Sequence, residues 1–552
     1  MDADAVIIGG GHNGLVCAAY LAQSGMRVLV VEARPSPGGC ASTVDAVGAR
    51  VNVCNCDHLA FRTTPIADEL GLDAFGLRYL DVDPAQLSVP WNGTRPWYSF
   101  HDLDRTLESL RRTHPDEVDN YRRYVKVARP AAELMLEMAT QVPTVPHAAR
   151  RVLERRGDGV RTLLSWSRRS VGDVLSGFFR SEALLAPVVV TGPAVWGLSP
   201  ETPNTGLGAV GYTLKHIGQV GRPEGGSGSL PNALAASITA RGGTIRCGAT
   251  VSRILADATG VRGVVLDDGT ILDAPRVVVA CDPTDAFLHW LAPAPSNLGA
   301  LVAKWRGRPH RDGYESKIDA VLEEVPPLPQ HAAAAGDELG VDRAWISTMI
   351  VAPTLRELGD AHRLMSDGRI AALPPLFVNI PSVLDPTMRV EGRGDASPAH
   401  VLSLEVLFTP YALQEGWART AQPERWLDLL GGLVGADVRA LIRDWRVVTP
   451  PVYESDFRMR RGHAPSFAGG PVAALVGRDR ELTRYETPLN GLFLTGAATF
   501  PGAGVWGASG RNAAHVILAG PRRTPNATAR SIVNRVRRPA AVGATAPGAV
   551  PA

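Results

Sequence analysis

The sequence lacks the features that mark metal-binding, secreted and membrane-spanning proteins. Only six of its 552 residues are cysteine, and no two of them form a C-x-x-C pair. Cys54-Asn55-Cys56 is too closely spaced for an ordinary zinc half-site, so we predict no metal. No apolar run reaches the roughly 18 residues of a membrane-spanning helix. Asp2 and Asp4 stand where a secretory signal has positive residues, so we expect a cytoplasmic protein with reduced thiols.

Charge and composition exclude two further classes. The formal net charge is +2, which gives no argument for a nucleic-acid partner. Hydrophobic residues make up 45% and charged residues 20% of the chain, which is typical of a globular protein rather than a disordered one. The length is enough for roughly two to four domains.

The strongest pattern lies near the start of the chain. Residues 6–8 and 28–31 are apolar runs of strand character. Residues 15–23 between them have a helical pattern, and Gly25 is placed to end that helix. Together these runs predict a strand–helix–strand unit with parallel strands.

A glycine motif occupies the first turn of this unit. Gly9, Gly11 and Gly14 form G-x-G-x-x-G between strand and helix, and Glu32 ends the second strand. Such glycines permit a tight turn and let a pyrophosphate approach the N–H groups at the helix N-terminus. Glu32 can accept hydrogen bonds from ribose hydroxyls and, as an anion, would repel a 2′-phosphate. The unit therefore predicts a dinucleotide site.

A loop with two prolines and a glycine pair follows Glu32. Its backbone at Gly38-Gly39 can approach a flat or charged ligand closely. Arg34 is placed to reach a phosphate or an adenosine edge.

The character of the chain changes over residues 76–214, where helical patterns and paired arginines dominate. The segment 160–179 carries an apolar stripe of helical period. With its neighbouring arginines this stripe could lie on a membrane surface or admit a greasy substrate. We favour the simpler interpretation, a helix that packs on the domain core.

Patterns of the first domain return after this helical stretch. Residues 224–234 form a second glycine-rich turn that opens a helix, and strand-like runs follow over 244–280 with a hairpin turn at 267–269. This indicates a β-meander, so that residues 76–214 are an insertion. Residues 291–460 are mixed, and there we expect strands at 346–351 and 401–408 and helices at 423–434 and 436–444.

The second strong signal lies at residues 491–514. A short buried strand at 492–495 ends at Gly496, a glycine-dense loop follows, and an alanine-rich helix begins near 507–511. This arrangement suits a planar ring with an anionic edge.

Taken together, the two glycine loops, the Gly38-Gly39 loop and the Gly-Gly-Ser-Gly helix opening at 225–228 resemble the phytoene desaturase-like branch of the FAD-dependent amine-oxidase superfamily. Within it the chain is most similar to the pyridine nucleotide-disulfide oxidoreductase domain 2 subgroup. That similarity rests on His12-Asn13 in the first turn and on the Gly-Ala-Ser-Gly-Arg-Asn run at 507–512.

The resemblance implies an FAD that runs through the molecule. The residues it places at FAD are Gly9, Gly11, Gly14, Glu32, Ala33, Arg34, Gly38, Gly39, Ser42, Val251, Gly496, Gly504, Val505 and Gly507. The first three would hold the pyrophosphate, Glu32 the ribose, and Val251 the adenine through its backbone. The residues from Gly504 to Gly507 would lie near the isoalloxazine ring.

The expected fold class is α/β, a Rossmann-type FAD-binding domain with a β-meander, plus an inserted mixed α+β substrate domain. We expect the FAD-binding domain over 1–75, 215–290 and 461–520, the substrate domain over 76–214 and 291–460, and a flexible tail over 521–552.

The catalytic residues are not evident from the sequence. The candidates are His58, Lys215 and Trp506, because many relatives place a lysine near the flavin ring and Trp506 adjoins the ring loop. Other polar or aromatic residues in plausible pocket-lining segments are Trp196, Tyr212, Tyr411, Arg458 and His463. Each is individually more often structural than catalytic.

The leading functional hypothesis is an FAD-dependent oxidoreductase that desaturates or oxidises a C–C or C–N bond of a hydrophobic, natural-product-like small molecule by hydride transfer to flavin. No second G-x-G-x-x-G follows a strand, so oxygen or a quinone is the expected electron acceptor. Two alternatives remain, a flavin-dependent isomerase or cyclase without net oxidation, and a non-enzymatic escort protein of the same fold. Peripheral membrane contact is left open.

Overall fold

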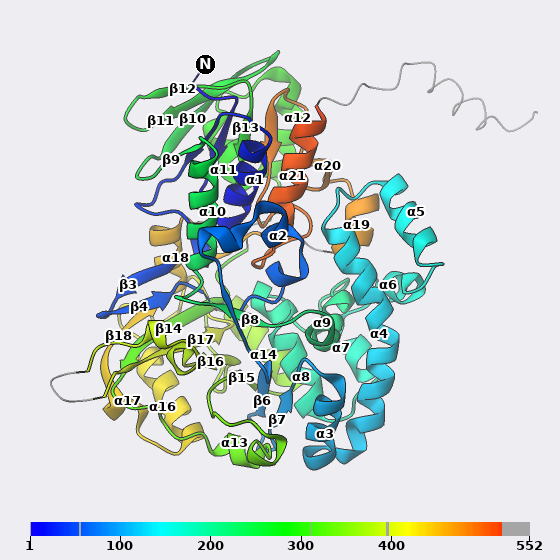
Figure 1. Cartoon of the computed structure of the whole chain (residues 1–552), viewed down its shortest axis with the longest axis vertical. Coiled ribbons are helices and arrows are strands. Elements are labelled where there is room, and N and C mark those ends of the chain that lie inside the picture. Colours follow the sequence, from blue (N-terminus) through cyan, green and yellow to red (C-terminus); the bar gives the residue numbers. More distant parts are fainter. Residues whose placement is uncertain (1, 55–56, 310, 393–396, 468, 521–552) are drawn as a thin grey trace, which may run out of the picture.

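The computed structural model describes residues 2–54, 57–309, 311–392, 397–467 and 469–520 (Figure 1). The tail expected over 521–552 lies outside the described residues, as does Cys56. The five cysteines that are described are all free thiols. Among the described residues, no helix is both long enough and apolar enough to cross a membrane.

A parallel sheet of five strands forms the upper part of the molecule in Figure 1. Its order is β19 (Leu492–Leu494), β13 (Val277–Val279), β1 (Ala5–Ile8), β2 (Val28–Val31) and β9 (Thr244–Arg246). All four neighbouring pairs are parallel. The predicted first strand–helix–strand unit is present, and its helix α1 spans His12–Gln23.

Both faces of this sheet are buried. Ile7 and Val30 pack against α1, α10 (Ser229–Ala240) and α21 (Ala508–Ala519). Val6 and Val277 pack against the other side, a three-stranded meander of β10 (Val251–Asp257), β11 (Gly260–Leu266) and β12 (Ile271–Asp273). Leu298 and Trp305, which belong to the region of α12 (Gly299–Arg306), share this second core. Burial on both faces explains why these strands are continuous apolar runs.

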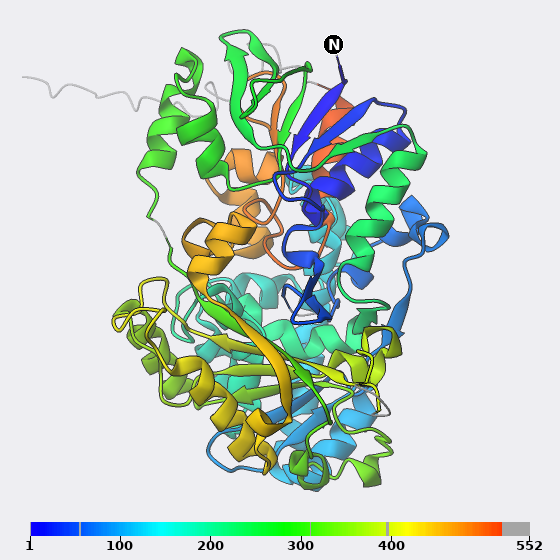
Figure 2. The ribbon, with the colours of Figure 1, turned by 90° about the vertical axis from the view of Figure 1, so that its left-hand side faces the viewer.

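A second sheet of seven strands forms the lower part of the molecule (Figure 2). Its order is β18 (Ile442–Val448), β14 (Glu315–Leu322), β17 (His400–Leu407), β16 (Leu376–Asn379), β15 (Thr348–Ala352), β6 (Gln86–Pro90) and β7 (Trp97–Ser99). Its strands therefore come from two stretches of the chain that a helical region separates. One face is apolar, and Ile318 and Leu404 pack there with Trp426 of α16 (Gln422–Val434).

The helical region lies beside this sheet, on the right in Figure 1. Its helices are α3 (Leu103–Thr113), α4 (Val118–Ala139), α5 (Val145–Glu154), α6 (Val160–Trp166), α7 (Val171–Ser176), α8 (Glu182–Val190) and α9 (Gly211–Ile217). The segment 160–179 is therefore two short helices rather than one. Most of its apolar stripe, including Leu163 and Val174, is buried in a core shared with α4 and α8, as the core-packing interpretation predicted.

The helix expected at 436–444 was wrong over its second half. Only Val438–Leu441 is helical (α17), and Ile442 begins strand β18, whose residues pair with β14 from Lys317 to Leu322. The open edge of β14 offers a ladder of hydrogen bonds, and that tertiary pairing overrides the local helical pattern.

Candidate functional site

A cavity of about 820 Å³ lies between the two sheets. Residues one or two positions after the ends of β1, β2, β13 and β19 line one end of it, namely Gly9, Glu32, Ala280 and Gly496. The carboxyl ends of the parallel strands therefore open onto this space, which is where doubly wound sheets place their ligands.

Most residues that the family resemblance places at FAD line this cavity. They are Gly9, Gly11, Glu32, Ala33, Arg34, Gly39, Val251, Gly496, Gly504 and Val505. Four others, Gly14, Gly38, Ser42 and Gly507, do not line the cavity. They shape the loops and the helix around it through close packing and hydrogen bonds.

The phosphate end of the cavity has the shape that an anionic ligand needs. A Cβ added to Gly11 would meet no atom within 4 Å, so the backbone there is open towards the cavity. Gly9 has φ +104°, a conformation that favours glycine. Helix α1 begins at His12, and its first N–H groups have no partners within the helix. These donors and the open backbone fit a pyrophosphate.

Glu32 is held rigidly at the edge of the cavity. Its Oε2 accepts the Gly10 N–H at 2.7 Å, and its Oε1 accepts the Arg34 N–H at 2.9 Å. The side chain is only 8% exposed. Each carboxylate oxygen retains a lone pair, so ribose hydroxyls can still donate to it.

Replacing Glu32 with alanine is expected to weaken FAD binding by about 1.5–3 kcal/mol, because charge-assisted hydrogen bonds to the ribose would be lost. The fraction of bound FAD that survives dialysis measures the loss. Asp45→Ala, on an exposed position of strand β3 (Thr43–Ala46), is the control. Equal retention by Glu32→Ala and wild type would contradict the assignment.

The loop after β2 supports the middle of the cavity. The Arg34 guanidinium lies over the Phe457 ring at 4.4 Å, and its Nη1 donates to Gly39 O at 3.3 Å. The Ser42 hydroxyl donates to the same carbonyl at 2.7 Å. The Gly38 N–H donates to Gly10 O at 2.8 Å. Gly38 and Ser42 thus fix the loop, while Gly39 faces the cavity.

The C-terminal loop closes the same space. Gly496 N–H donates to Ser509 Oγ at 3.0 Å, and His12 Nε2 lies 3.1 Å from Gly504 O. That contact joins the first turn of the chain to its last loop. Gly507 instead allows close packing, since its Cβ would lie 2.9 Å from Ile66 Cδ1. Trp506, the expected ring-side wall, is not among the residues that line the cavity.

The far wall of the cavity is one face of the seven-stranded sheet. Strand register places Glu405 opposite Phe377, and Phe377 opposite Ile350. Two residues before Ile350 on β15, Thr348 lies opposite Gln86 of β6. All five residues line the cavity, so this face combines apolar and polar side chains.

The two remaining catalytic candidates lie in different places. Lys215 lines the cavity, and its Nζ donates to Gln86 Oε1. His58 does not line it. Its Nδ1 lies 3.0 Å from the Tyr79 hydroxyl and its Nε2 lies 2.7 Å from Ser227 Oγ. Burial lowers the His58 pKa to about 3, as for a neutral structural histidine.

Of the other pocket residues proposed from the sequence, some line the cavity and some do not. Trp196 and Arg458 line the cavity, whereas Tyr212, Tyr411 and His463 do not.

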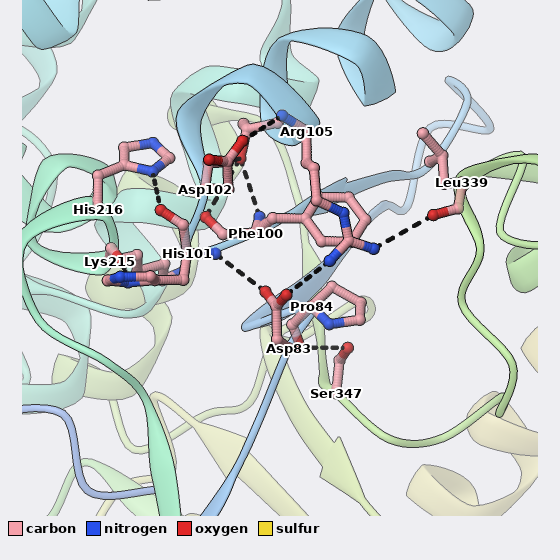
Figure 3. A network of polar contacts seen from close by, with 11 residues as sticks. Asp83, Pro84, Phe100, His101, Asp102, Arg105, Lys215, His216, Leu339 and Ser347 are labelled. Atoms are coloured by element: carbon pink, nitrogen blue, oxygen red, sulfur yellow. Dashed lines mark hydrogen bonds and ion pairs between the residues drawn. The ribbon is translucent and has the colours of Figure 1, made fainter.

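A polar network holds the helix that carries Lys215 (Figure 3). His101 Nδ1 donates to Lys215 O at 3.0 Å, and His216 Nδ1 donates to His101 O at 3.0 Å. Asp83 in turn accepts the His101 N–H at 3.0 Å and Arg105 Nη1 at 2.7 Å. These contacts join α9 to the β7–α3 connection and so fix the backbone of Lys215.

Burial lowers the pKa of Lys215 to about 7. An unfolded lysine has a pKa of about 10.4, so the unfolded state binds more protons between these values. Folding stability should therefore rise with pH from about 7 to about 10. Lys215→Met is expected to be more stable than wild type at neutral pH and to lose this rise. Denaturant titrations of both proteins across this range measure the difference, and parallel curves would contradict it.

Sequence reasoning missed the charged residues of the far wall. Glu315 and Glu405 line the cavity, as does Asp57, which accepts Arg222 Nε at 2.8 Å. One signal was available, because Glu315, Lys317 and Asp319 alternate with less polar residues along one strand. Such alternation predicts a strand with a polar face, but it does not distinguish a solvated face from one that lines a cavity.

Fold and site together define an α/β protein whose cavity, at the carboxyl ends of a parallel sheet, fits a dinucleotide. Residues 14–301 match the family of flavin-containing amine oxidoreductases, so the chain belongs to that family. It is an FAD-dependent oxidoreductase, and the phosphate end of the cavity described above fits that cofactor.

Similar proteins extend over nearly the whole chain. Pyridine nucleotide-disulfide oxidoreductase domain-containing protein 2 of Rattus norvegicus is 27% identical, with 93% of each chain covered. One of the polypeptides of limonene dehydrogenase from Castellaniella defragrans is 26% identical over 93% of this chain and 94% of that one. Lycopene-forming phytoene desaturase of Pseudescherichia vulneris is 24% identical over 91% and 96%. The resemblance seen in the glycine motifs is thereby confirmed.

Solved structures share the fold. Cyclohexylamine oxidase of Brevibacterium oxydans superposes with a TM-score of 0.57 at 18% identity, with 95% of this chain and 100% of that chain covered. An oxidoreductase from Methanosarcina mazei gives 0.59 at 17% identity, over 93% and 99%.

Proposed function

We propose that this protein desaturates or oxidises a C–C or C–N bond of a hydrophobic small molecule. The observation that carries the proposal is the cavity that runs from Glu32 at the cofactor end to Phe377 and Ile350 on the second sheet. A substrate on that sheet would lie in the same cavity as the cofactor. The names of the desaturase and dehydrogenase relatives support this choice of reaction.

We also propose the division of labour expected from the sequence. The segments 1–75, 215–290 and 461–520 would bind FAD, and 76–214 with 291–460 would hold substrate. Of the residues assigned to FAD by the family resemblance, those that line the cavity would contact the cofactor. Gly14, Gly38, Ser42 and Gly507 would shape the backbone around it.

The bound cofactor supplies the capacity to accept a hydride. The chain's own residues would bind the substrate, orient it and exclude water. Phe377 and Ile350 offer an apolar surface for a carbon skeleton. Gln86, held by Lys215, and Thr348 offer hydrogen bonds for a polar group. Oxygen or a quinone is the proposed final acceptor, since the sequence shows no second nucleotide motif.

Anaerobic mixing of the FAD-loaded protein with hydrophobic candidates tests the proposal. A substrate should bleach the flavin absorbance stoichiometrically, and mass spectrometry should find a product two hydrogens lighter. Turnover without bleaching would indicate the isomerase or cyclase alternative. A colourless protein that takes up no added FAD would indicate the escort alternative.

A further inference from the structure

Two carboxyl side chains that the proposed function does not use face the cavity together. Glu315 lies on β14 and Glu405 on the neighbouring strand β17. Register places Glu405 opposite Lys317, and Glu315 opposite Leu407. The two glutamates are therefore diagonal neighbours on one face of an antiparallel pair, within reach of each other for long side chains. Both line the cavity although their residues are only 4% and 6% exposed.

The cation opposite Glu405 on the neighbouring strand makes its hydrogen bonds to groups other than the two glutamates. Lys317, fully buried, donates its Nζ to Asp319 and to Asn52 O, the latter at 2.8 Å. Asp319 also pairs with Arg446 at 2.9 Å. Lys317 therefore lowers the pKa of both glutamates only through space.

The contacts of the two carboxyls differ. Within the described part of the chain, Glu405 Oε1 receives no hydrogen bond, and Phe377 lies across from it on β16. The Glu315 Oε1 lies 4.0 Å from Cys54 Sγ. The nearby Tyr453 hydroxyl donates to Val53 O at 3.4 Å and opposes the rise in the pKa of Glu315 that burial causes. Glu405 is thus the cavity-lining carboxyl that keeps a buried oxygen without a hydrogen-bond donor among the described residues.

Two buried carboxylates this close cannot both ionise readily. Burial raises the pKa of Glu315 to about 7, and the charge of Cys40 adds to the rise. Burial raises the pKa of Glu405 to about 8, and the charge of Glu315 adds to the rise. The charge of one carboxylate disfavours ionisation of the other, so a state with a proton on one of the two is favoured.

We propose that Glu315 and Glu405 act as a shared-proton pair in which Glu405 takes up the proton that leaves the substrate during oxidation. The inference rests on the proposed function. The bound cofactor would accept one hydrogen of the substrate together with both electrons of its C–H bond. The adjacent C–H or N–H bond gives its proton to the carboxylate, and its electron pair becomes the new double bond. The proton then passes to solvent when the pair ionises again.

Other titratable groups face the pair and must be considered. Lys317 and Asp319 share β14 with Glu315, and Arg446 lies on β18. Cys40, Cys54 and Asp57 come from the loops beside the cofactor end, and Tyr314 and Tyr453 complete the surroundings. Glu→Gln changes leave all of these in place and preserve side-chain shape.

The test uses FAD-loaded wild type, Glu405→Gln and Glu315→Gln, with Glu338→Gln on an exposed helical turn as the control. Infrared difference spectra over a pH titration detect the carbonyl stretch of a protonated buried carboxyl. In wild type and control, we expect a band that disappears between about pH 7 and 8. Either Gln variant should shift that titration to lower pH, because the like charge is removed. Absence of a titrating band in wild type would overturn the shared proton.

The second measurement is anaerobic flavin reduction by a substrate found in the screen described above. The wild-type rate should rise with pH as the pair ionises. Glu405→Gln should reduce flavin at least about 100-fold more slowly, within the range known for general bases, while retaining FAD. Wild-type rates in Glu405→Gln would overturn the proposal. A wild type that no compound reduces would count against the proposed function instead, and the infrared titration would still decide on the pair.

Discussion

Replacing Gly14 with alanine is expected to abolish stable FAD binding and to destabilise the fold. A Cβ at this position would overlap the Gly9 carbonyl oxygen and would lie 2.9 Å from Ala280 Cβ. Gly9 belongs to the turn that opens the phosphate end, and Ala280 follows β13. Because the strongest overlap is with backbone, a rotamer change cannot relieve it. We expect a loss of about 1–3 kcal/mol in the free energy of unfolding and at least tenfold in FAD affinity, about 1.4 kcal/mol.

A matched control separates this effect from helix propensity. Gly432 lies inside helix α16, and a Cβ there would meet no atom within 4 Å. Gly432→Ala should stabilise the protein by about 0.5–1 kcal/mol, since alanine is the better helix former. Gly14 is also helical, so propensity alone predicts the same gain there. Denaturant unfolding and FAD titration of both variants decide, and a stabilised Gly14→Ala that binds FAD normally would refute the packing argument.

The cofactor half of the molecule could be predicted from sequence because its signals are local. Strands buried on both faces are continuous apolar runs, so residues 6–8 and 28–31 were recognisable without a partner. The glycines of the first turn and of the last loop have direct backbone reasons to be glycine. The helix start near 507–511 also agrees with Ala508 in the structure.

The substrate half could not be predicted, since its site depends on pairing between distant strands. Glu315 and Glu405 become neighbours only through the register of β14 and β17. No local pattern predicts that register. None indicates that the charged face of β14 lines a cavity rather than facing solvent. The local sequence around His58, a polar, cysteine-containing stretch, could not show whether this histidine is catalytic or structural. In the structure both of its ring nitrogens have hydrogen-bond partners, Tyr79 and Ser227.

Replacing Arg222 with methionine is expected to destabilise the protein by about 3–5 kcal/mol. Arg222 lies on β8 (Gly221–Pro223) and is fully buried, and its Nε donates to Asp57 Oδ1 at 2.8 Å. Asp57 also accepts the Thr348 hydroxyl from the far wall of the cavity. Methionine fills similar volume but leaves the carboxylate without its cationic partner. The cost comes from that uncompensated charge rather than from lost packing.

A double-mutant cycle tells these two causes apart. Asp57→Asn removes the charge, so Arg222→Met combined with Asp57→Asn should be more stable than Arg222→Met alone. Equal losses in the single and double variants would assign the effect to packing. Arg150→Met is the surface comparison, because its pair with Glu154 leaves Arg150 73% exposed and should contribute no more than about 0.5 kcal/mol. If the contrast holds, Asp57 with Arg222 stabilises the link between β8 and Thr348 on the far wall of the cavity.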